Sequence, residues 1–234
     1  MYISRNQNDM NMKAVTPEFN TLANNSGANT RKRHRLQLND VYFSRVFKPL
    51  LFILLSLPLV YYAWGIWQDQ LGANPLEAVI RGLGDWGLRI LLLTLLISPL
   101  RRLLNWPQLL RVRRMLGLFA YFYIVMHFMS YLWFDQFFDW EEIWFDILER
   151  PFITVGMIAV VLLTPLAITS TKGMIRRLGK RWKLLHMLIY PIGILAVLHF
   201  WWMVKLDITE PAIYAFILFI LLGERVYRKV LREF

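Results

Sequence analysis

Three of the four histidines in the chain lie in segments made almost entirely of apolar residues. They are His127, His186 and His199, and the last two share the stretch KRWKLLHMLIYPIGILAVLHFWW. The chain has no cysteine, which excludes disulfides, thiolate-bound iron–sulfur clusters and cysteine nucleophiles. Any metal must therefore be bound through nitrogen or oxygen, and imidazole nitrogen suits iron, copper and zinc.

Histidines in apolar segments can serve three purposes. The simplest is a hydrogen bond to a neighbouring helix, which stabilises a membrane protein by about 1 kcal/mol. A proton relay is a weaker hypothesis, because the segments contain almost no Asp or Glu to pass protons onward. The third is axial ligation of b-type haem, since a helix bundle can enclose a porphyrin and present histidines from facing helices. We expect haem ligation.

The elements that must position these histidines are membrane helices. Hydrophobic residues make up 57% of the chain, more than a water-soluble globule of this size carries. Six apolar segments approach the roughly 20 residues that a helix needs to cross a bilayer. The predicted fold is therefore an all-α integral membrane bundle of six transmembrane helices. The segments are Val46–Trp67, Trp86–Leu104, Met115–Phe134, Pro151–Thr169, Leu184–Val204 and Pro211–Gly223.

The charges of the connections alternate along the chain. Lys and Arg minus Asp and Glu gives +5, −2, +5, −5, +6, −1 and +2 for the seven parts outside the spans, from Met1–Lys48 to Glu224–Phe234. This is the positive-inside pattern for six membrane helices with both termini in the cytoplasm. The net charge of +11 therefore reflects topology and membrane lipid, and no nucleic-acid partner is expected.

Residues 1–40 are predicted to be a disordered cytoplasmic tail, because they are rich in Asn, Ser and Thr and lack apolar periodicity. Residues 41–234 form the membrane domain. No glycine-rich phosphate loop or dinucleotide fingerprint is present. The protein therefore cannot take a hydride from a nicotinamide by itself.

Helical rise separates the three histidines by depth. His127 follows Arg114 by about 20 Å of rise and His199 follows Lys183 by about 24 Å, on helices that leave the cytosol in the same direction. We therefore expect these two to be the axial ligands of one haem. His186 lies only three residues past Lys183, near the cytosolic surface and too far along the helix to bind the same iron.

Arg89 is the main charged residue inside a predicted span. Its guanidinium can bind a haem propionate as a fork, or it can extend to the membrane interface. The sequence does not choose between these two roles.

The order and spacing of several short motifs carry a family resemblance. They run from Leu71 to Lys205 and read LGANP, LLLTLLISPL, RVRRMLGL, HFMSY, RPFITVG, TSTKG, LGKRWKLLH and HFWW. The chain resembles MsrQ, the family of haem-binding membrane subunits of the bacterial system that repairs methionine sulfoxide in periplasmic proteins. This family lies within the ferric-reductase-like transmembrane superfamily, so residues 41–234 are expected to form a six-helix haem domain of that type.

The resemblance implies that His127, His186 and His199 bind one or two haem b groups, and FMN is also associated with the family. It implies a subunit without catalytic residues, which takes electrons from a quinol or a cytosolic flavin reductase. The implied acceptor is a periplasmic molybdopterin-containing methionine sulfoxide reductase. Relatives with two haems have a histidine fourteen residues before the first ligand, where this chain has Arg113. His186 therefore lacks an obvious histidine partner.

Two alternatives remain open at this point. A metal reductase of the same superfamily would deliver electrons to a ferric or cupric chelate. A haem-free transporter or assembly protein would use the histidines for packing or protonation.

Overall fold

The computed structural model describes residues 43–204 and 207–231, and all regular structure within these ranges is helical. The predicted disordered tail lies outside the described residues. The chain divides into two units between Ile53 and Leu54. In the first, Phe43–Phe47 form a short π-helix in which the Phe43 and Phe47 rings stack at 5.0 Å. It leads into α3 (Lys48–Trp67), which continues into the second unit.

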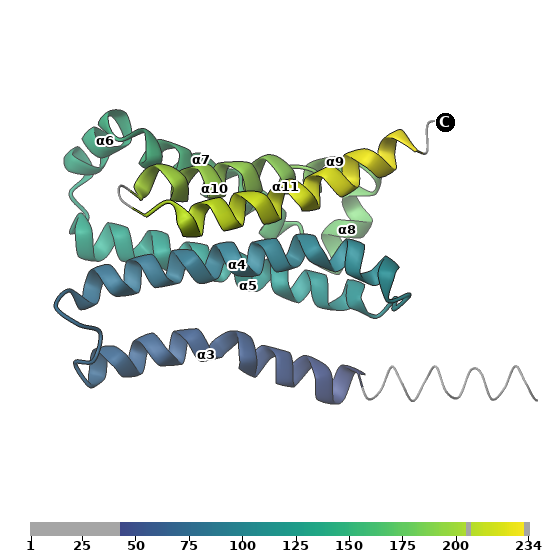
Figure 1. Ribbon diagram of the computed structural model, residues 1–234, viewed down its shortest axis with the longest axis horizontal. Coiled ribbons are helices and arrows are strands. Elements are labelled where there is room, and N and C mark those ends of the chain that lie inside the picture. The colour runs from purple at the N-terminus through teal and green to yellow at the C-terminus, as the bar shows by residue number, and fades with distance from the viewer. Residues whose placement is uncertain (1–42, 205–206, 232–234) are drawn as a thin grey trace, which may run out of the picture. The chain divides into compact units, whose positions relative to one another are not determined.

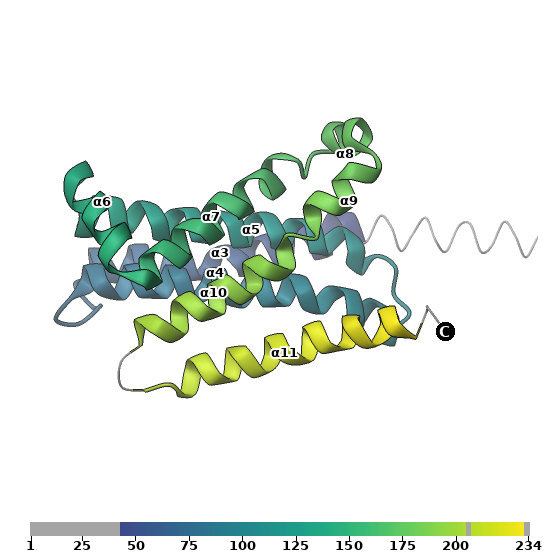
Figure 2. The same cartoon turned by 90° about the horizontal axis from the view of Figure 1, so that it is seen from above.

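Two helix pairs form the centre of the second unit. One pair is α4 (Pro75–Leu103) with α5 (Leu109–Ser130), and the other is α7 (Pro151–Ile168) with α10 (Ile189–Met203). The pairs meet through α5 against α7 and α4 against α10. The last helix, α11 (Thr209–Val230), lies along α10 and α4, as Figures 1 and 2 show.

Short helices occupy the two ends of this bundle. The π-helix η2 (Tyr131–Asp135) and α6 (Trp140–Glu149) lie at one end, whereas α8 (Lys172–Leu178) and α9 (Lys180–His186) lie at the other (Figure 1). The acidic connection, residues 135–150, and the basic connection, residues 170–183, are therefore at opposite ends. We refer to these as the acidic end and the basic end.

Five helices in the described part of the chain are long and apolar enough to cross a membrane: Arg45–Trp67, Pro75–Leu103, Leu109–Asp135, Pro151–Ile168 and Lys180–Met203. The prediction of an all-helical membrane bundle is confirmed at this level. The span in α4 is 56% buried and the others only 17–28%, so α4 is the central helix and the rest expose apolar side chains to lipid. The sixth predicted span lies in α11, which ends in charged residues, and it stays a prediction, as does the orientation of the termini.

The second span begins earlier than the sequence predicted. We expected Trp86–Leu104, but α4 starts at Pro75. Asn74 caps the helix by accepting a hydrogen bond from the Glu77 amide at 3.2 Å, and Pro75 stands at the first helical position, where its missing N–H costs nothing. The hydropathy of the segment hid this start, because Glu77, Arg81 and Asp85 lie in the first turns.

The fifth predicted span, Leu184–Val204, is interrupted. Helix α9 ends at His186 and α10 begins at Ile189. Pro191 explains the break, because its ring has no N–H to donate to the carbonyl of Met187 and clashes with that carbonyl in a regular helix. His186 and His199 therefore lie on two separate helices.

Candidate functional site

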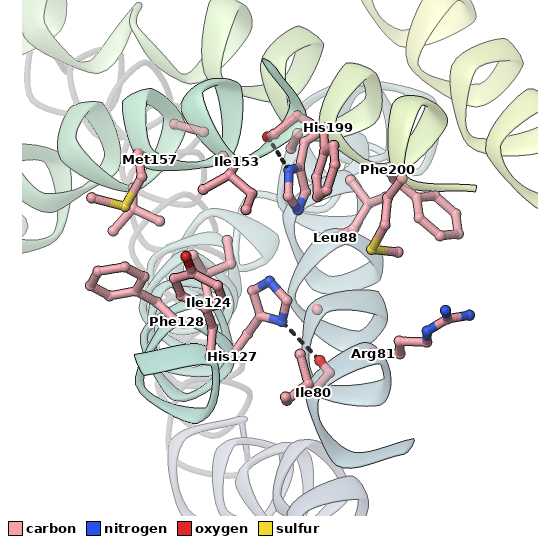
Figure 3. A pocket seen from close by; sticks show the side chains of 18 of the residues that line it. Ile80, Arg81, Leu88, Ile124, His127, Phe128, Ile153, Met157, His199 and Phe200 are labelled. Atoms are coloured by element: carbon pink, nitrogen blue, oxygen red, sulfur yellow. Dashed lines mark hydrogen bonds between the residues drawn. The ribbon is translucent and has the colours of Figure 1, made fainter. Parts of the chain in front are cut away.

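His127 on α5 and His199 on α10 face each other in the interior of the bundle. The centroids of their imidazole rings are 6.1 Å apart, with an angle of 73° between the ring planes. Figure 3 shows one ring below and one above an open space. The two residues that the sequence placed at similar depth are thus brought together by the fold.

A backbone carbonyl holds each of these rings. The Nδ1 atom of His127 lies 2.8 Å from the carbonyl oxygen of Ile80, and that of His199 lies 2.6 Å from the carbonyl oxygen of Phe152. A carbonyl can only accept, so each Nδ1 must carry the proton. The Nε2 atom of each neutral ring then keeps its lone pair, and Figure 3 shows it directed toward the other ring.

A glycine on the facing helix makes room for each ring. A Cβ atom on Gly84 of α4 would lie 3.1 Å from Nδ1 of His127, and one on Gly156 of α7 would lie 2.8 Å from Nδ1 of His199. The second distance is too short for any real side chain. Each glycine lies one helical turn after the residue whose carbonyl accepts the hydrogen bond from the ring. The carbonyl and the space beside the glycine together fix the position of the imidazole.

The two histidine positions are built by an internal repeat. Each histidine bonds the carbonyl of the residue 47 positions before it. Adding 72 to the number of a residue of α4 or α5 that lines the space between the rings gives a residue of α7 or α10 that also lines it. Five of the equivalent pairs that line the space between the rings are Ile80 and Phe152, Gly84 and Gly156, Leu88 and Val160, His127 and His199, and Phe128 and Phe200.

The space between the rings is a cavity lined by α4, α5, α7 and α10. Most of its lining is aliphatic or aromatic, and it reaches inward as far as Leu163 and Ile192. The polar lining residues are Arg81, Asp85, Tyr131, Asp135 and Arg150. They come from the first part of α4 and from the segment around η2 and α6, which places them toward the acidic end.

His186 lies outside this cavity, at the end of α9. Its ring stacks on Trp182 at 3.9 Å, and its Nδ1 is 3.1 Å from the carbonyl of the same residue. Its Nε2 atom is buried, and the ring also interacts with the backbone of Leu166. His186 is thus separate from the facing pair and lies at the basic end.

Arg89 also lies away from the cavity lining. Its Nε donates to the hydroxyl of Tyr214 on α11 at 2.8 Å, and its guanidinium lies 5.2 Å from the ring centre of Trp86. The suggested role at a haem propionate stays a prediction. The structure gives Arg89 a contact that joins α4 to α11.

No group of three or more His, Asp or Glu side chains in residues 43–204 and 207–231 is arranged to hold a metal ion. The facing pair presents two imidazole nitrogens on opposite sides of one point. A metal bound there would need its remaining ligands from a second molecule.

Sequence reasoning missed Gly84, Gly156 and the carbonyls of Ile80 and Phe152. Neither glycine stands out by composition, and a backbone carbonyl leaves no trace in a sequence. The constant offset of 72 residues between His127 and His199 and between Gly84 and Gly156 was the available signal.

Known proteins are similar to this chain over most of its length. Residues 83–197 match the family described as "Ferric reductase like transmembrane component". The chain is 54% identical to the "Protein-methionine-sulfoxide reductase heme-binding subunit MsrQ" of Rhodospirillum rubrum, over 78% of this chain and 88% of that one. It is 52% identical to the protein of the same name from Azospira oryzae, over 78% and 79%, and 54% identical to that from Herminiimonas arsenicoxydans, over 77% and 84%. No solved structure matches significantly.

Proposed function

Since the chain belongs to the MsrQ family of haem-binding subunits, we propose that it binds haem b between His127 and His199 and carries electrons across the bacterial inner membrane. The single observation that carries this proposal is the facing pair, in which both Nδ1 atoms donate to backbone carbonyls and both Nε2 atoms are free.

The spacing of the two rings fits one metal atom between them. Imidazole nitrogen binds a metal at about 2 Å, and the ring centroid lies about 1 Å farther back, so two axial imidazoles have centroids about 6 Å apart. The observed separation is 6.1 Å. The apolar lining and the two glycines suit a flat apolar ring system, whose four nitrogens would complete the coordination.

The carbonyls of Ile80 and Phe152 fix how the histidines act. By accepting the Nδ1 proton, each carbonyl selects the tautomer with a free Nε2 and increases the basicity of that nitrogen. Haem held by two imidazoles would supply one-electron transfer without an open position for substrate. The protein would therefore donate electrons and carry out no reaction on the sulfoxide itself.

Electrons are proposed to enter at the basic end, near His186. The position of this residue at the basic end and the Trp182 ring stacked on it support a binding site for a second redox group. That group would be FMN, a quinone from the donor quinol, or an inner haem with a ligand other than histidine. The basic connection beside it would sit at the cytosolic face, where a flavin reductase can dock.

The acceptor is proposed to be a periplasmic molybdopterin-containing methionine sulfoxide reductase that binds at the acidic end. The names of the relatives support a reductase partner, because they describe a subunit of protein-methionine-sulfoxide reductase. The periplasmic, molybdopterin-containing type is what the family resemblance implies. The exposed carboxylates of α6, Glu141, Glu142 and Glu149, support it, because surface charge steers the association of redox partners.

The match to the ferric reductase component favours one other candidate. In that case the terminal acceptor would be a ferric or cupric chelate at the same end of the bundle. Reduced protein mixed with the reductase subunit or with a ferric chelate separates the two, since only the physiological acceptor should reoxidise it rapidly.

An absorbance spectrum tests the central proposal. Detergent-purified protein from haem-replete cells should show a low-spin b-type spectrum that sharpens on dithionite reduction, with a haem-to-protein ratio of at least one. A colourless preparation would remove the electron-transfer function and favour a transporter or assembly role.

A further inference from the structure

Because of the internal repeat, the residues that α4 and α5 contribute to the cavity resemble those from α7 and α10. Three pairs of corresponding residues nevertheless differ in polarity. Arg81, Asp85 and Tyr131 in the first repeat correspond to Ile153, Met157 and Met203 in the second. All six side chains line the cavity. In each pair the polar member comes from α4 or η2 and the apolar member from α7 or α10.

The polar residues also share a level along the bundle. Arg81 directly follows Ile80, whose carbonyl holds His127, and Arg150 lies two residues before Phe152, whose carbonyl holds His199. Tyr131 lies one turn past His127, toward the acidic end. Beyond the histidines in the other direction, Leu163 and Ile192 leave the cavity apolar.

We propose that a haem in this cavity turns its two propionates toward the acidic end, where Arg81 and Arg150 bind them, and its apolar edge toward the basic end. This inference rests on the proposed haem site. A haem has one edge with two carboxylates, and burying these in the apolar part of the cavity would leave two charges without partners. Guanidinium groups bind carboxylates as planar forks.

Both arginines are free to exchange their present partners. Arg81 pairs with Glu77 at 2.6 Å, and Arg150 pairs with Asp146 at 3.2 Å. The Arg81 and Arg150 side chains are 59% and 54% exposed. Glu77 is exposed as well, so its pair with Arg81 stabilises the protein very little. Asp146 is buried, but it keeps hydrogen bonds from Tyr131 and Gln136 if Arg150 turns away from it. A propionate at the mouth of the cavity can therefore compete for each guanidinium.

Two acidic residues also line the mouth, and each interacts with a neighbouring group. Asp85 interacts with both Arg89 and Arg81. Asp135 accepts a weak hydrogen bond of 3.4 Å from the side-chain amide of Gln136. Tyr131 donates its hydroxyl hydrogen to Asp146 at 3.1 Å, so the proposal assigns the propionates to the two guanidinium groups.

The orientation gives electron transfer a direction. The apolar edge of the porphyrin would face the electron-input site near His186, and the propionate edge would face the segment around η2 and α6. Electrons would then leave through the edge nearest the proposed docking surface.

A redox titration of the haem-loaded protein tests this assignment. We expect Arg81→Gln and Arg150→Gln each to lower the midpoint potential, and the double variant to lower it further, because an unbalanced propionate favours the more positive ferric state. Arg101→Gln, at the basic end of the same helix α4, is the matched control and should leave the potential unchanged. The bands of the propionates in the resonance Raman spectrum should shift in both single variants and in the double variant, but not in Arg101→Gln.

Lysine substitutions keep the proposal testable if the glutamine variants lose haem. If the double glutamine variant fails to retain haem, Arg81→Lys with Arg150→Lys should restore binding, because the charge is kept. Midpoint potentials and Raman bands equal to those of Arg101→Gln would overturn the orientation. A coloured wild-type protein with that result would leave the proposed function intact, whereas a colourless one would remove both.

Discussion

Gly156 provides the space that the His199 ring occupies: a Cβ atom at this position would lie 2.8 Å from Nδ1 and 2.9 Å from Cε1 of that ring. The same relationship joins Gly84 to His127 with slightly more room, at 3.1 Å and 3.2 Å. Both contacts are to atoms of a ring that is also held by a carbonyl, so the ring cannot move aside without losing its hydrogen bond.

Gly156→Ala should therefore weaken haem binding by about 1–3 kcal/mol, the usual cost of overpacking, and Gly84→Ala should weaken it less. The measurement is haem retention per protein during purification and the width of the low-spin bands. Gly223→Ala is the matched control, because a Cβ there meets nothing within 4 Å, and helical Ala stabilises by about 0.5–1 kcal/mol relative to Gly. Equal haem retention in Gly156→Ala and Gly223→Ala would contradict the prediction.

Substitution of either facing histidine should remove the low-spin spectrum. In His127→Ala and in His199→Ala one axial nitrogen is lost, so we expect high-spin or absent haem in both. His186→Ala should keep the low-spin spectrum but slow reduction by a quinol or flavin donor, because its ring lies outside the cavity. If His186→Ala removed all haem while His199→Ala kept a six-coordinate spectrum, the ligand pair would be His127 with His186.

The acidic end should control association with the reductase subunit. Not all of its six acidic residues are available for docking, because Asp139 caps α6 and Asp146 is buried. We therefore expect Glu141→Gln, Glu142→Gln and Glu149→Gln together to slow reoxidation of reduced haem by the partner several-fold at low salt. The wild-type rate should fall as salt increases, and the triple variant should lose this dependence. Unchanged rates would mean that the segment is acidic only because of membrane topology.

Asp146 should contribute more to stability than to docking. Its carboxylate accepts hydrogen bonds from Tyr131 at 3.1 Å and Gln136 at 2.7 Å and pairs with Arg150, while its residue is only 6% exposed. Asp146→Ala leaves buried donors unpaired and should lower the free energy of unfolding by about 3 kcal/mol. Glu142→Ala, on the exposed side of α6, should change it by less than about 0.5 kcal/mol. Thermal unfolding of both variants in the same detergent decides whether this ranking holds.

Glu224 should make the stability of the basic end depend on pH. Partial burial disfavours its charged form, but hydrogen bonds from Arg102 and Arg228 outweigh this and hold the pKa of Glu224 below its ordinary value. A carboxyl with a lowered pKa stabilises the fold above its unfolded pKa of about 4.3 and loses this contribution as the pH falls through the folded pKa. The melting temperature of wild type should exceed that of Glu224→Gln near neutral pH, and the difference should shrink in acid. A difference that stays constant with pH would show that the charge of Glu224 is not involved.

Much of the architecture follows from local properties of the sequence. Runs of apolar residues predict membrane helices because a bilayer leaves no other way to satisfy the backbone. The alternating charge of the connections predicts which ends of the helices meet. The predicted start of the second membrane segment at Trp86 was wrong, since α4 begins at Pro75. Charged residues in the first turns of α4 lowered the hydropathy there. The break before Pro191 was not predicted either, since Pro58, Pro99 and Pro165 lie inside unbroken helices and a proline alone does not decide between the two outcomes.

The candidate site divides in the same way. The rise of a helix is nearly constant, so the sequence alone determined that His127 and His199 lie at similar depth and that His186 lies nearer the basic end. Only the tertiary structure decided that the carbonyls of Ile80 and Phe152 hold the rings and that Gly84 and Gly156 make room for them. Each histidine is 47 residues from the carbonyl that holds it and 43 residues from the glycine that makes room for it. The geometry of these contacts depends on how closely the backbones of two helices approach. Hydropathy and periodicity describe one helix at a time, so they carry no information about that distance.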